Sequence, residues 1–134
     1  MSLMHIRYQG SFRTEALHLD SQNKILTDAP KDNQGNGEAF SPTDLMSTSL
    51  ASCMLTIMAM KARSLGLELP ELEVKLEKKM AANPRRVAEI VLHFDWKGWE
   101  QTLSPAQLQE LKQAGLNCPV YLSLHPEVKK TIHW

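Results

Sequence analysis

Apolar and polar positions alternate near the start of the chain, over Met4–Gln9. This period of two predicts a β-strand with one buried face. A second strand is expected over Phe12–Leu19, and a short third strand over Lys24–Thr27 after a polar turn. The segment Ala29–Phe40 is rich in Asn and Gly, which predicts a loop.

The longest apolar run in the chain predicts a helix from Ser41 to Gly66. Ser41 is a suitable N-cap, Pro42 suits the first helical position, and Asp44 complements the exposed amides of the first turn. The predicted helix has about 24 residues and a length of ~36 Å. Its first four turns are apolar or small on nearly every face. We therefore expect it to lie inside the protein or against a second copy of itself.

Two further alternating segments, Leu72–Glu77 and Val87–Trp96, predict a β-hairpin with a turn at Asn83-Pro84. In the second segment the even-numbered positions, beginning at Ala88, are expected to face the core. Val87 and the other odd-numbered positions are expected to lie on the opposite, charged face. The hairpin therefore has one predicted core face and one predicted charged face.

The remaining residues predict two helical segments and a last strand. Ser104–Gln107 forms a capping-box start for a helix that Gly115 is expected to stop. Cys118–Leu124 predicts a short helical segment, and Val128–His133 predicts the final strand. This order of strands and helices is typical of an α+β fold.

Length and charge limit the classes of function. A chain of 134 residues is expected to form one domain, with Met4 as a plausible natural start and Met1–Leu3 added before it. The 15 basic and 15 acidic residues balance, so we expect neither nucleic acid nor a membrane surface as a partner. Ser and Thr interrupt the run Leu45–Met60, which falls short of the ~18 apolar residues of a membrane span. Two cysteines and no signal peptide predict a cytoplasmic, reducing location.

The two cysteines are the leading candidates for chemistry. Cys53 lies about three turns inside the long helix, beyond its N-terminal dipole, so inert packing is its default role. As a thiolate it would need a cation, for which Arg7 and Arg13 are the candidates. Cys118 precedes Pro119, and amides at the start of the following helix would lower the pKa of its thiol. A buried cysteine at a tight turn is the alternative for this position.

The surroundings of both cysteines resemble the signatures of the OsmC/Ohr family. Gly37–Met54 contains a Ser-Pro dipeptide, a short acidic helix start, a Leu and small residues that lead to Cys53. Asn117–Val120 matches the second signature at the expected distance, and the order of elements fits from about Met4 to Trp134. The resemblance implies an intertwined homodimer, in which two central long helices are flanked by antiparallel sheets and both active sites lie at the interface.

The resemblance also implies an activity, which is the thiol-dependent reduction of organic hydroperoxides. Cys53 resembles the peroxidatic cysteine and Cys118 the resolving cysteine. The implied cycle passes through a sulfenic acid and a disulfide, and an external dithiol restores the thiols. No cofactor is implied.

One position departs from the family pattern. Thr43 stands where the best-studied peroxidases of the family have a Glu that holds an activating Arg. Glu38 and Asp44 are candidates to replace that Glu beside the substrate. No motif identifies the arginine, and we select Arg13 over Arg7. The chain therefore resembles a divergent branch of the family.

Two other classes of function stay open. The first is a non-catalytic module that binds an apolar or thiol-bearing small molecule at the dimer interface, and the second is a structural dimer with inert thiols. An arginine within hydrogen-bonding reach of Cys53 would favour the peroxidase over both. No metal site is expected, because the five histidines show no ligand spacing and the chain has neither CxxC nor HExxH.

Overall fold

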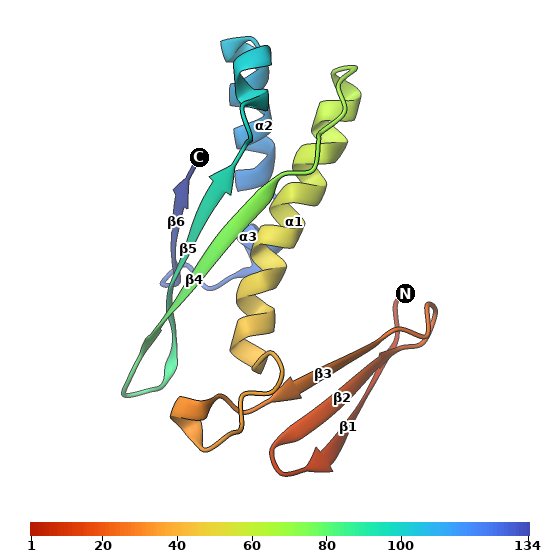
Figure 1. Cartoon of the computed structure of the whole chain (residues 1–134), viewed down its shortest axis with the longest axis vertical. Coiled ribbons are helices and arrows are strands. Elements are labelled where there is room, and N and C mark those ends of the chain that lie inside the picture. Colours follow the sequence, from red (N-terminus) through yellow and green to blue (C-terminus); the bar gives the residue numbers. More distant parts are fainter. The chain divides into compact units, whose positions relative to one another are not determined.

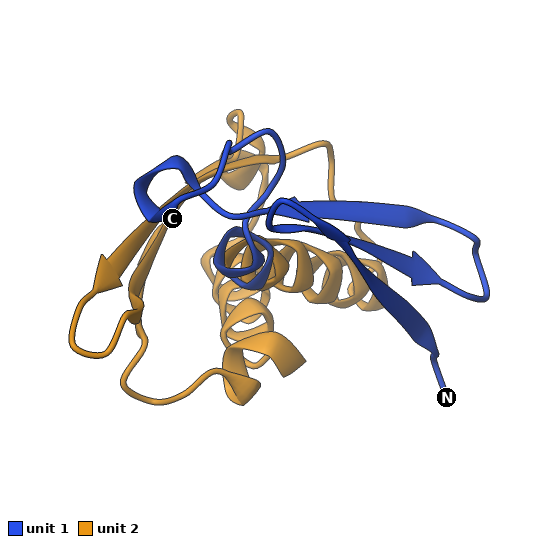
Figure 2. Cartoon of the chain, turned by 90° about the horizontal axis from the view of Figure 1, so that it is seen from below, with its two compact units in different colours: residues 1–46 blue, residues 47–134 orange.

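The structure is a computed structural model that describes all 134 residues. Along the chain it contains three strands, a long helix, two strands, two shorter helices and a last strand (Figure 1). The chain divides into two compact units, residues 1–46 and 47–134 (Figure 2). The boundary falls inside the long helix. The expectation of one domain stays a prediction.

The first unit contains an antiparallel sheet in the order β1-β2-β3. It is formed by β1 (Met4–Gly10), β2 (Arg13–His18) and β3 (Lys24–Asp28). All three strands lie within one residue of their predicted bounds. The loop that follows contains one 3-10 turn, η1 (Lys31–Asn33).

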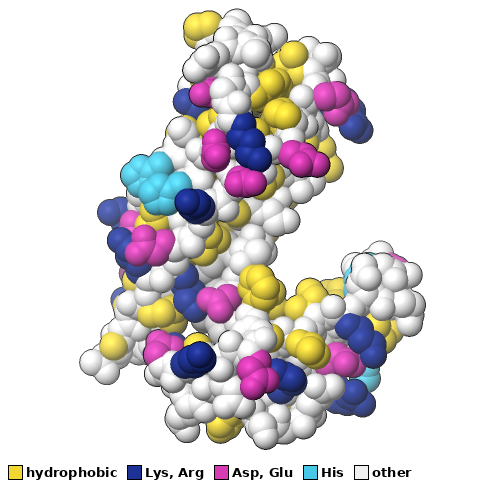
Figure 3. All heavy atoms as spheres, viewed as in Figure 1, with side chains coloured by type: hydrophobic (Ala, Val, Ile, Leu, Met, Phe, Trp, Pro, Cys, Tyr) yellow, Lys and Arg dark blue, Asp and Glu magenta, His cyan; other side chains and the backbone are white.

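One face of β1 is apolar and exposed. Met4, Ile6 and Tyr8 share this face, and they are 57%, 60% and 63% exposed. The buried hydrophobic core contains no residue of the first unit. The predicted burial of one face of β1 is therefore wrong for the single chain, because no element of the first unit packs against it. Figure 3 shows apolar side chains reaching the surface in both units.

The long helix α1 (Pro42–Ser64) begins and ends as its sequence predicts. At its start, Asp44 N donates to Ser41 Oγ (3.1 Å) and Ser41 N donates to Asp44 Oδ2 (2.9 Å). These reciprocal bonds satisfy two amides that the helix leaves free. At its end, Gly66 has a φ of +76°, and Leu67 N donates to a carbonyl in the last turn (2.9 Å). This is the glycine stop that the sequence predicted.

Only one stripe of α1 is fully buried. Its members recur every three or four residues and are Ser47, Leu50, Met54, Met58 and Ala62. Most apolar residues outside the stripe are only partly buried, and Met60 is 62% exposed. By length and composition alone α1 could cross a membrane, a test that core helices of soluble proteins also pass. Because the buried stripe belongs to the hydrophobic core of the second unit, we interpret α1 as a core helix.

The second unit contains a three-stranded sheet in the order β4-β5-β6. The predicted hairpin is formed by β4 (Glu73–Ala81) and β5 (Arg86–Asp95), which pair in antiparallel fashion. The last strand, β6 (Lys129–His133), pairs with β5 in parallel. A parallel pair needs a long crossover connection, and the two shorter helices provide it.

A β-bulge changes the face of one residue in the hairpin. Lys79 pairs with Glu89, but Met80 pairs with Val87, so Ala88 has no partner. Beyond the bulge the odd-numbered side of β5 turns toward the core, and Val87 is buried within it. The predicted placement of Val87 on the charged face is therefore wrong.

Two helices follow the hairpin after a 3-10 turn, η2 (Trp99–Thr102). The first is α2 (Pro105–Leu116), and the second is the short α3 (Pro119–Ser123). At the start of α2, Gln107 N donates to Ser104 Oγ (3.1 Å) and Ser104 N donates to Gln107 Oε1 (2.9 Å). The predicted capping box is confirmed.

Gly115 does not stop α2, which continues to Leu116. The glycine is buried and faces Met54 and Met58 of α1. The predicted stop at Gly115 is wrong, because a glycine near a helix end also occurs where two helices approach closely. The core of the second unit is enclosed by α1, α2 and one face of the sheet (Figure 1).

Candidate thiol site

The fold brings together the two cysteines, which lie far apart in the sequence. Cys53 lies in the middle of α1 and is half-buried, whereas Cys118 immediately precedes α3 and is fully buried. Both belong to the second unit and both are free thiols. Cys53 lies close enough to Cys118 to contribute to the raised pKa of the Cys118 thiol. Cys118 belongs to the hydrophobic core of this unit, and Cys53 packs against that core.

Three backbone-linked hydrogen bonds fix the position of Cys118. Its N–H donates to the carbonyl of Gly115 (3.2 Å), and its own carbonyl accepts from the N–H of Leu122 (3.1 Å). Its Sγ accepts from the N–H of Tyr121 at 3.3 Å, so the sulfur caps α3. The sequence predicted that this sulfur lies beside the first amides of the helix, with either Asn117 or Cys118 as its cap, and the structure shows that the cap is Cys118.

The pKa of the Cys118 thiol is nevertheless raised. Burial is the largest cause, because it disfavours the charged thiolate. The amides of Tyr121 and Val120 oppose the shift, and the neighbouring Cys53 adds to it. The expected net lowering of this pKa is therefore wrong, since desolvation outweighs the amides. Cys118 is a neutral thiol at pH 7.

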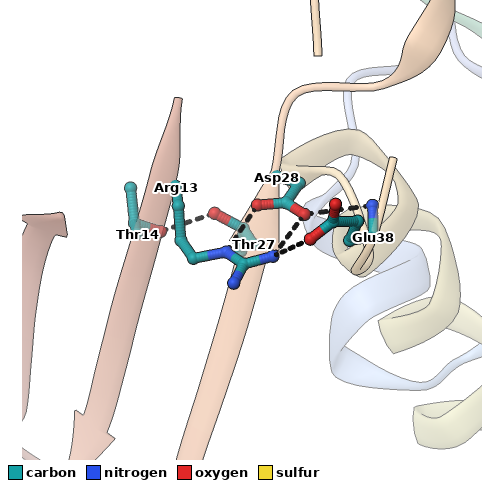
Figure 4. A network of polar contacts seen from close by, with 5 residues as sticks. All are labelled: Arg13, Thr14, Thr27, Asp28 and Glu38. Atoms are coloured by element: carbon teal, nitrogen blue, oxygen red, sulfur yellow. Dashed lines mark hydrogen bonds and ion pairs between the residues drawn. The ribbon is translucent and has the colours of Figure 1, made fainter. Parts of the chain in front are cut away.

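The arginine selected from the sequence lies in the first unit, where two carboxylates hold it (Figure 4). Arg13 Nε donates to Asp28 Oδ1 and Nη2 donates to Asp28 Oδ2, both at 2.8 Å. Arg13 Nη2 also donates to Glu38 Oε2 at 3.2 Å. The Arg13 guanidinium lowers the pKa of Asp28, and it does so against the effect of burial. A bidentate pair of this kind fixes the plane of the guanidinium.

The two carboxylates proposed to replace the family's Glu differ in their contacts. Glu38 binds Arg13, and its backbone N–H donates to Asp28 Oδ2 at 3.0 Å. Asp44 accepts instead from Ser41 N at the start of α1. Arg7 forms an ion pair with Glu15 at 3.5 Å, and its side chain is 64% exposed. Arg13 is therefore the more firmly held of the two candidate arginines.

The sequence of the chain matches a known protein family. Residues 35–133 match the family described as OsmC-like protein. The chain belongs to the OsmC-like family. A similar structure comes from Psychrobacter arcticus and is provisionally described as an osmotic stress induced and detoxification response protein. It is 46% identical, with a TM-score of 0.87 over 99% of this chain and 95% of that chain.

More distant structures share the OsmC-like fold. An organic hydroperoxide resistance protein OsmC from Legionella pneumophila is 17% identical, with a TM-score of 0.75 over 99% of this chain and 95% of that chain. A provisionally described organic hydroperoxide resistance protein from Vibrio cholerae has captopril bound in one of its active sites. It is 17% identical, with a TM-score of 0.75 over 99% of this chain and 90% of that chain. No match was found among curated proteins.

Sequence reasoning missed one polar residue of this OsmC-like protein. Asp28 is only 4% exposed and makes the strongest contact to Arg13, yet the third strand was expected to end one residue before it. The two residues are direct partners across β2 and β3. An explicit alignment of these strands would have revealed the pair.

Proposed function

We propose that this OsmC-like protein is a thiol-dependent peroxidase that reduces organic hydroperoxides through Cys53 and Cys118. The observation that carries the proposal is that two free thiols from distant parts of the chain lie near each other in different surroundings. Cys53 is the more accessible thiol, whereas the buried Cys118 is neutral at pH 7. The first attack on a peroxide is therefore assigned to Cys53, and the resolving step to Cys118.

In the proposed cycle, the Cys53 thiolate attacks the O–O bond of the hydroperoxide. The alcohol leaves after taking a proton, and the Cys53 sulfur becomes a sulfenic acid. The Cys118 sulfur then attacks the Cys53 sulfur. Its proton leaves with the hydroxyl group as water, and a disulfide forms. An external dithiol supplies the two electrons and two protons that restore both thiols, and such a donor fits a cytoplasmic location.

Arg13 is the proposed source of the positive charge that stabilises the Cys53 thiolate. The support for this role is that Asp28 and Glu38 hold its guanidinium in one orientation. Thr43 at the position of the family's Glu is then no obstacle, because Asp28 supplies a buried carboxylate from β3. Glu38 and Asp44 remain predicted residues on the substrate side of the site.

The proposed active form is a homodimer. Large apolar side chains stay exposed on both units of the single chain, and a partner copy is the expected cover. The most exposed of them on the strands, loops and long helix are Met4, Ile6, Tyr8, Phe12, Ile25, Phe40 and Met60. The helix α1 is apolar on more faces than its own chain covers, which supports the same conclusion.

A second candidate function is a binding module without turnover. The specific observation in its favour is the Vibrio cholerae relative, which holds captopril in one of its active sites. Captopril is a small molecule with a thiol group. A protein of this kind would bind such a compound near Cys53 and leave the peroxide unreduced.

Trapping of intermediates separates these two functions. The reduced protein receives one equivalent of cumene hydroperoxide, and mass spectrometry follows the products. The peroxidase predicts cumyl alcohol and a 53–118 disulfide in the wild type, and a dimedone-reactive Cys53 in Cys118→Ser. Recovery of unreacted peroxide with both thiols intact would contradict the peroxidase and favour the binding module.

A further inference from the structure

Gly115 of α2 faces two methionine side chains of α1. A Cβ atom at this position would lie 3.1 Å from Met58 Sδ, 3.3 Å from Met54 Cε and 3.3 Å from Met58 Cγ. Ordinary contacts between carbon atoms are about 3.5–4.0 Å. Both methionines are fully buried in the core. A side chain at residue 115 would therefore require Met54, Met58 or the helix α2 to shift by a few tenths of an ångström.

Helix termination does not explain this glycine. The last turn of α2 includes Gly115, which lacks the positive φ of a glycine stop such as Gly66, and glycine in a helical conformation is less favourable than alanine. A position that bears this conformational cost inside a helix needs another reason. The contact with Met54 and Met58 supplies one.

The same contact lies between the two segments that carry the thiols. Met54 directly follows Cys53 in α1. On the other side, the Gly115 carbonyl accepts a hydrogen bond from Cys118 N–H at 3.2 Å. A displacement of Gly115 away from α1 is therefore passed through this bond to Cys118. A disulfide tolerates little error, because its S–S bond is about 2.05 Å and its Cα atoms must lie within about 4.4–6.8 Å.

We infer that Gly115 is a positioning residue for the thiol pair. By allowing α2 to approach Met54 and Met58, it sets the separation of Cys53 and Cys118 and thereby the rate at which they close to a disulfide. The inference rests on the proposed redox pairing of these two cysteines. It does not depend on which oxidant drives the pairing.

The test measures disulfide closure without a peroxide. Diamide is added to the fully reduced full-length protein, and its azo group takes two electrons and two protons from the two thiols. Samples are quenched with an alkylating agent, and mass spectrometry gives the fraction with a 53–118 disulfide. The variants are Gly115→Ala, Gly115→Val and the matched control Gly66→Ala. A Cβ at Gly66 meets no atom within 4 Å, although its φ of +76° makes alanine unfavourable there.

Gly115→Ala is expected to slow closure roughly fivefold, since a displacement of even a fraction of an ångström misaligns reacting atoms. Gly115→Val should slow it further, and both variants should shift the equilibrium with dithiothreitol toward the reduced thiols. Gly66→Ala should close at the wild-type rate, even though its urea midpoint falls. The double variant Gly115→Ala/Met58→Ala should recover part of the rate, because the shorter side chain at 58 leaves room for the new methyl group.

Several results would overturn the inference. One is closure of folded Gly115→Ala at the wild-type rate, and another is an equal loss of rate in Gly66→Ala, which would indicate a general effect of stability. Absence of a 53–118 disulfide in diamide-treated wild type would overturn it as well. If the wild type closes with diamide but consumes no organic hydroperoxide, the proposed peroxidase fails and the positioning role of Gly115 stands.

Discussion

Cys53 and Cys118 meet in one site, yet their surroundings give them different chemistry. Cys118 is fully buried, and desolvation raises the pKa of its thiol above the ordinary value. The hydrogen bond that its sulfur accepts from the Tyr121 N–H opposes this shift but does not cancel it. Cys53 is only half-buried on the side of α1. A neutral, buried thiol is suited to the proposed resolving step, and a more accessible thiol is suited to the proposed first attack on the peroxide.

The raised pKa of Cys118 predicts how stability depends on pH. The folded state favours the neutral thiol, so its contribution is fully present below the unfolded pKa of about 8.5 and is lost as pH rises through the folded pKa. Under reducing conditions, the free energy of unfolding should fall more steeply above pH 8.5 in the wild type than in Cys118→Ala. Urea titrations between pH 7 and 10 measure this difference. Equal slopes for the two proteins would contradict the assigned environment of Cys118.

Asp28 should matter more to the first unit than Glu38 does. Both carboxylates bind Arg13, but Asp28 is 4% exposed whereas the Glu38 side chain is 64% exposed. Asp28→Asn removes the buried carboxylate charge that pairs with two nitrogens of Arg13 and should lower the melting temperature. Glu38→Gln is the matched control and should change it little. Because Arg13 lowers the pKa of Asp28, the wild-type advantage should disappear as pH falls through the folded pKa of Asp28. Equal melting temperatures for both variants at pH 7 would contradict this ranking.

For the helices and strands, the sequence predicts those features that depend only on residues close together along the chain. The caps at Ser41 and Ser104 and the glycine stop at Gly66 are local signals, and the structure confirms them. Val87 was assigned to the wrong face because a bulge is defined by pairing between two strands. Gly115 was misinterpreted because a helix stop and a close helix contact both favour glycine.

In the candidate site, too, the sequence predicted the local features but not those that depend on the tertiary structure. The family signatures and the Cys-Pro pair predicted which thiols to examine, and the fold places them together. The net pKa of Cys118 could not be predicted, because it depends on how deeply the tertiary structure buries the sulfur. Asp28 carried no local signal either, since its role depends on its alignment with Arg13 across two strands.

The buried stripe of α1 should carry much of the stability of the second unit. Leu50 is fully buried in the core, so Leu50→Ala should cost about 2–5 kcal/mol of the free energy of unfolding. Leu122→Ala is the same change at a position that is 67% exposed, and it should stay within about 0.5 kcal/mol. Urea denaturation gives both values. A loss at Leu122 as large as that at Leu50 would show that the stripe is not the principal core contact.

For the whole molecule, the division of apolar residues between the units is the decisive feature. The second unit has its own core, whereas the first contributes no residue to it and exposes the apolar face of β1. A lone chain with these surfaces would be prone to association. The proposed homodimer removes them from water, and its interface should exceed the ~2,000 Å² typical of permanent complexes.

Sedimentation tests the dimer, with two adjacent positions of β1 as a matched pair. The wild type should sediment as a dimer at micromolar concentration. Ile6→Lys places a charge on the apolar face of β1 and should weaken or abolish the dimer. His5→Lys places the same charge on the opposite face and should leave the dimer intact. A folded wild-type monomer at that concentration, or equal behaviour of the two variants, would contradict the proposed interface.

The central claim is that Cys53 reduces an organic hydroperoxide and Cys118 resolves the product. The most direct measurement is the consumption of cumene hydroperoxide in the presence of a dithiol that cannot itself resolve the Cys53 sulfenic acid quickly. The wild type should turn over continuously and prefer this substrate to hydrogen peroxide, whereas Cys53→Ser should consume none. Cys118→Ser should consume one equivalent rapidly to form the sulfenic acid, and excess peroxide should then oxidise it further and inactivate the protein. Equally slow oxidation of all three proteins, at the rate of an ordinary free thiol, would contradict the account.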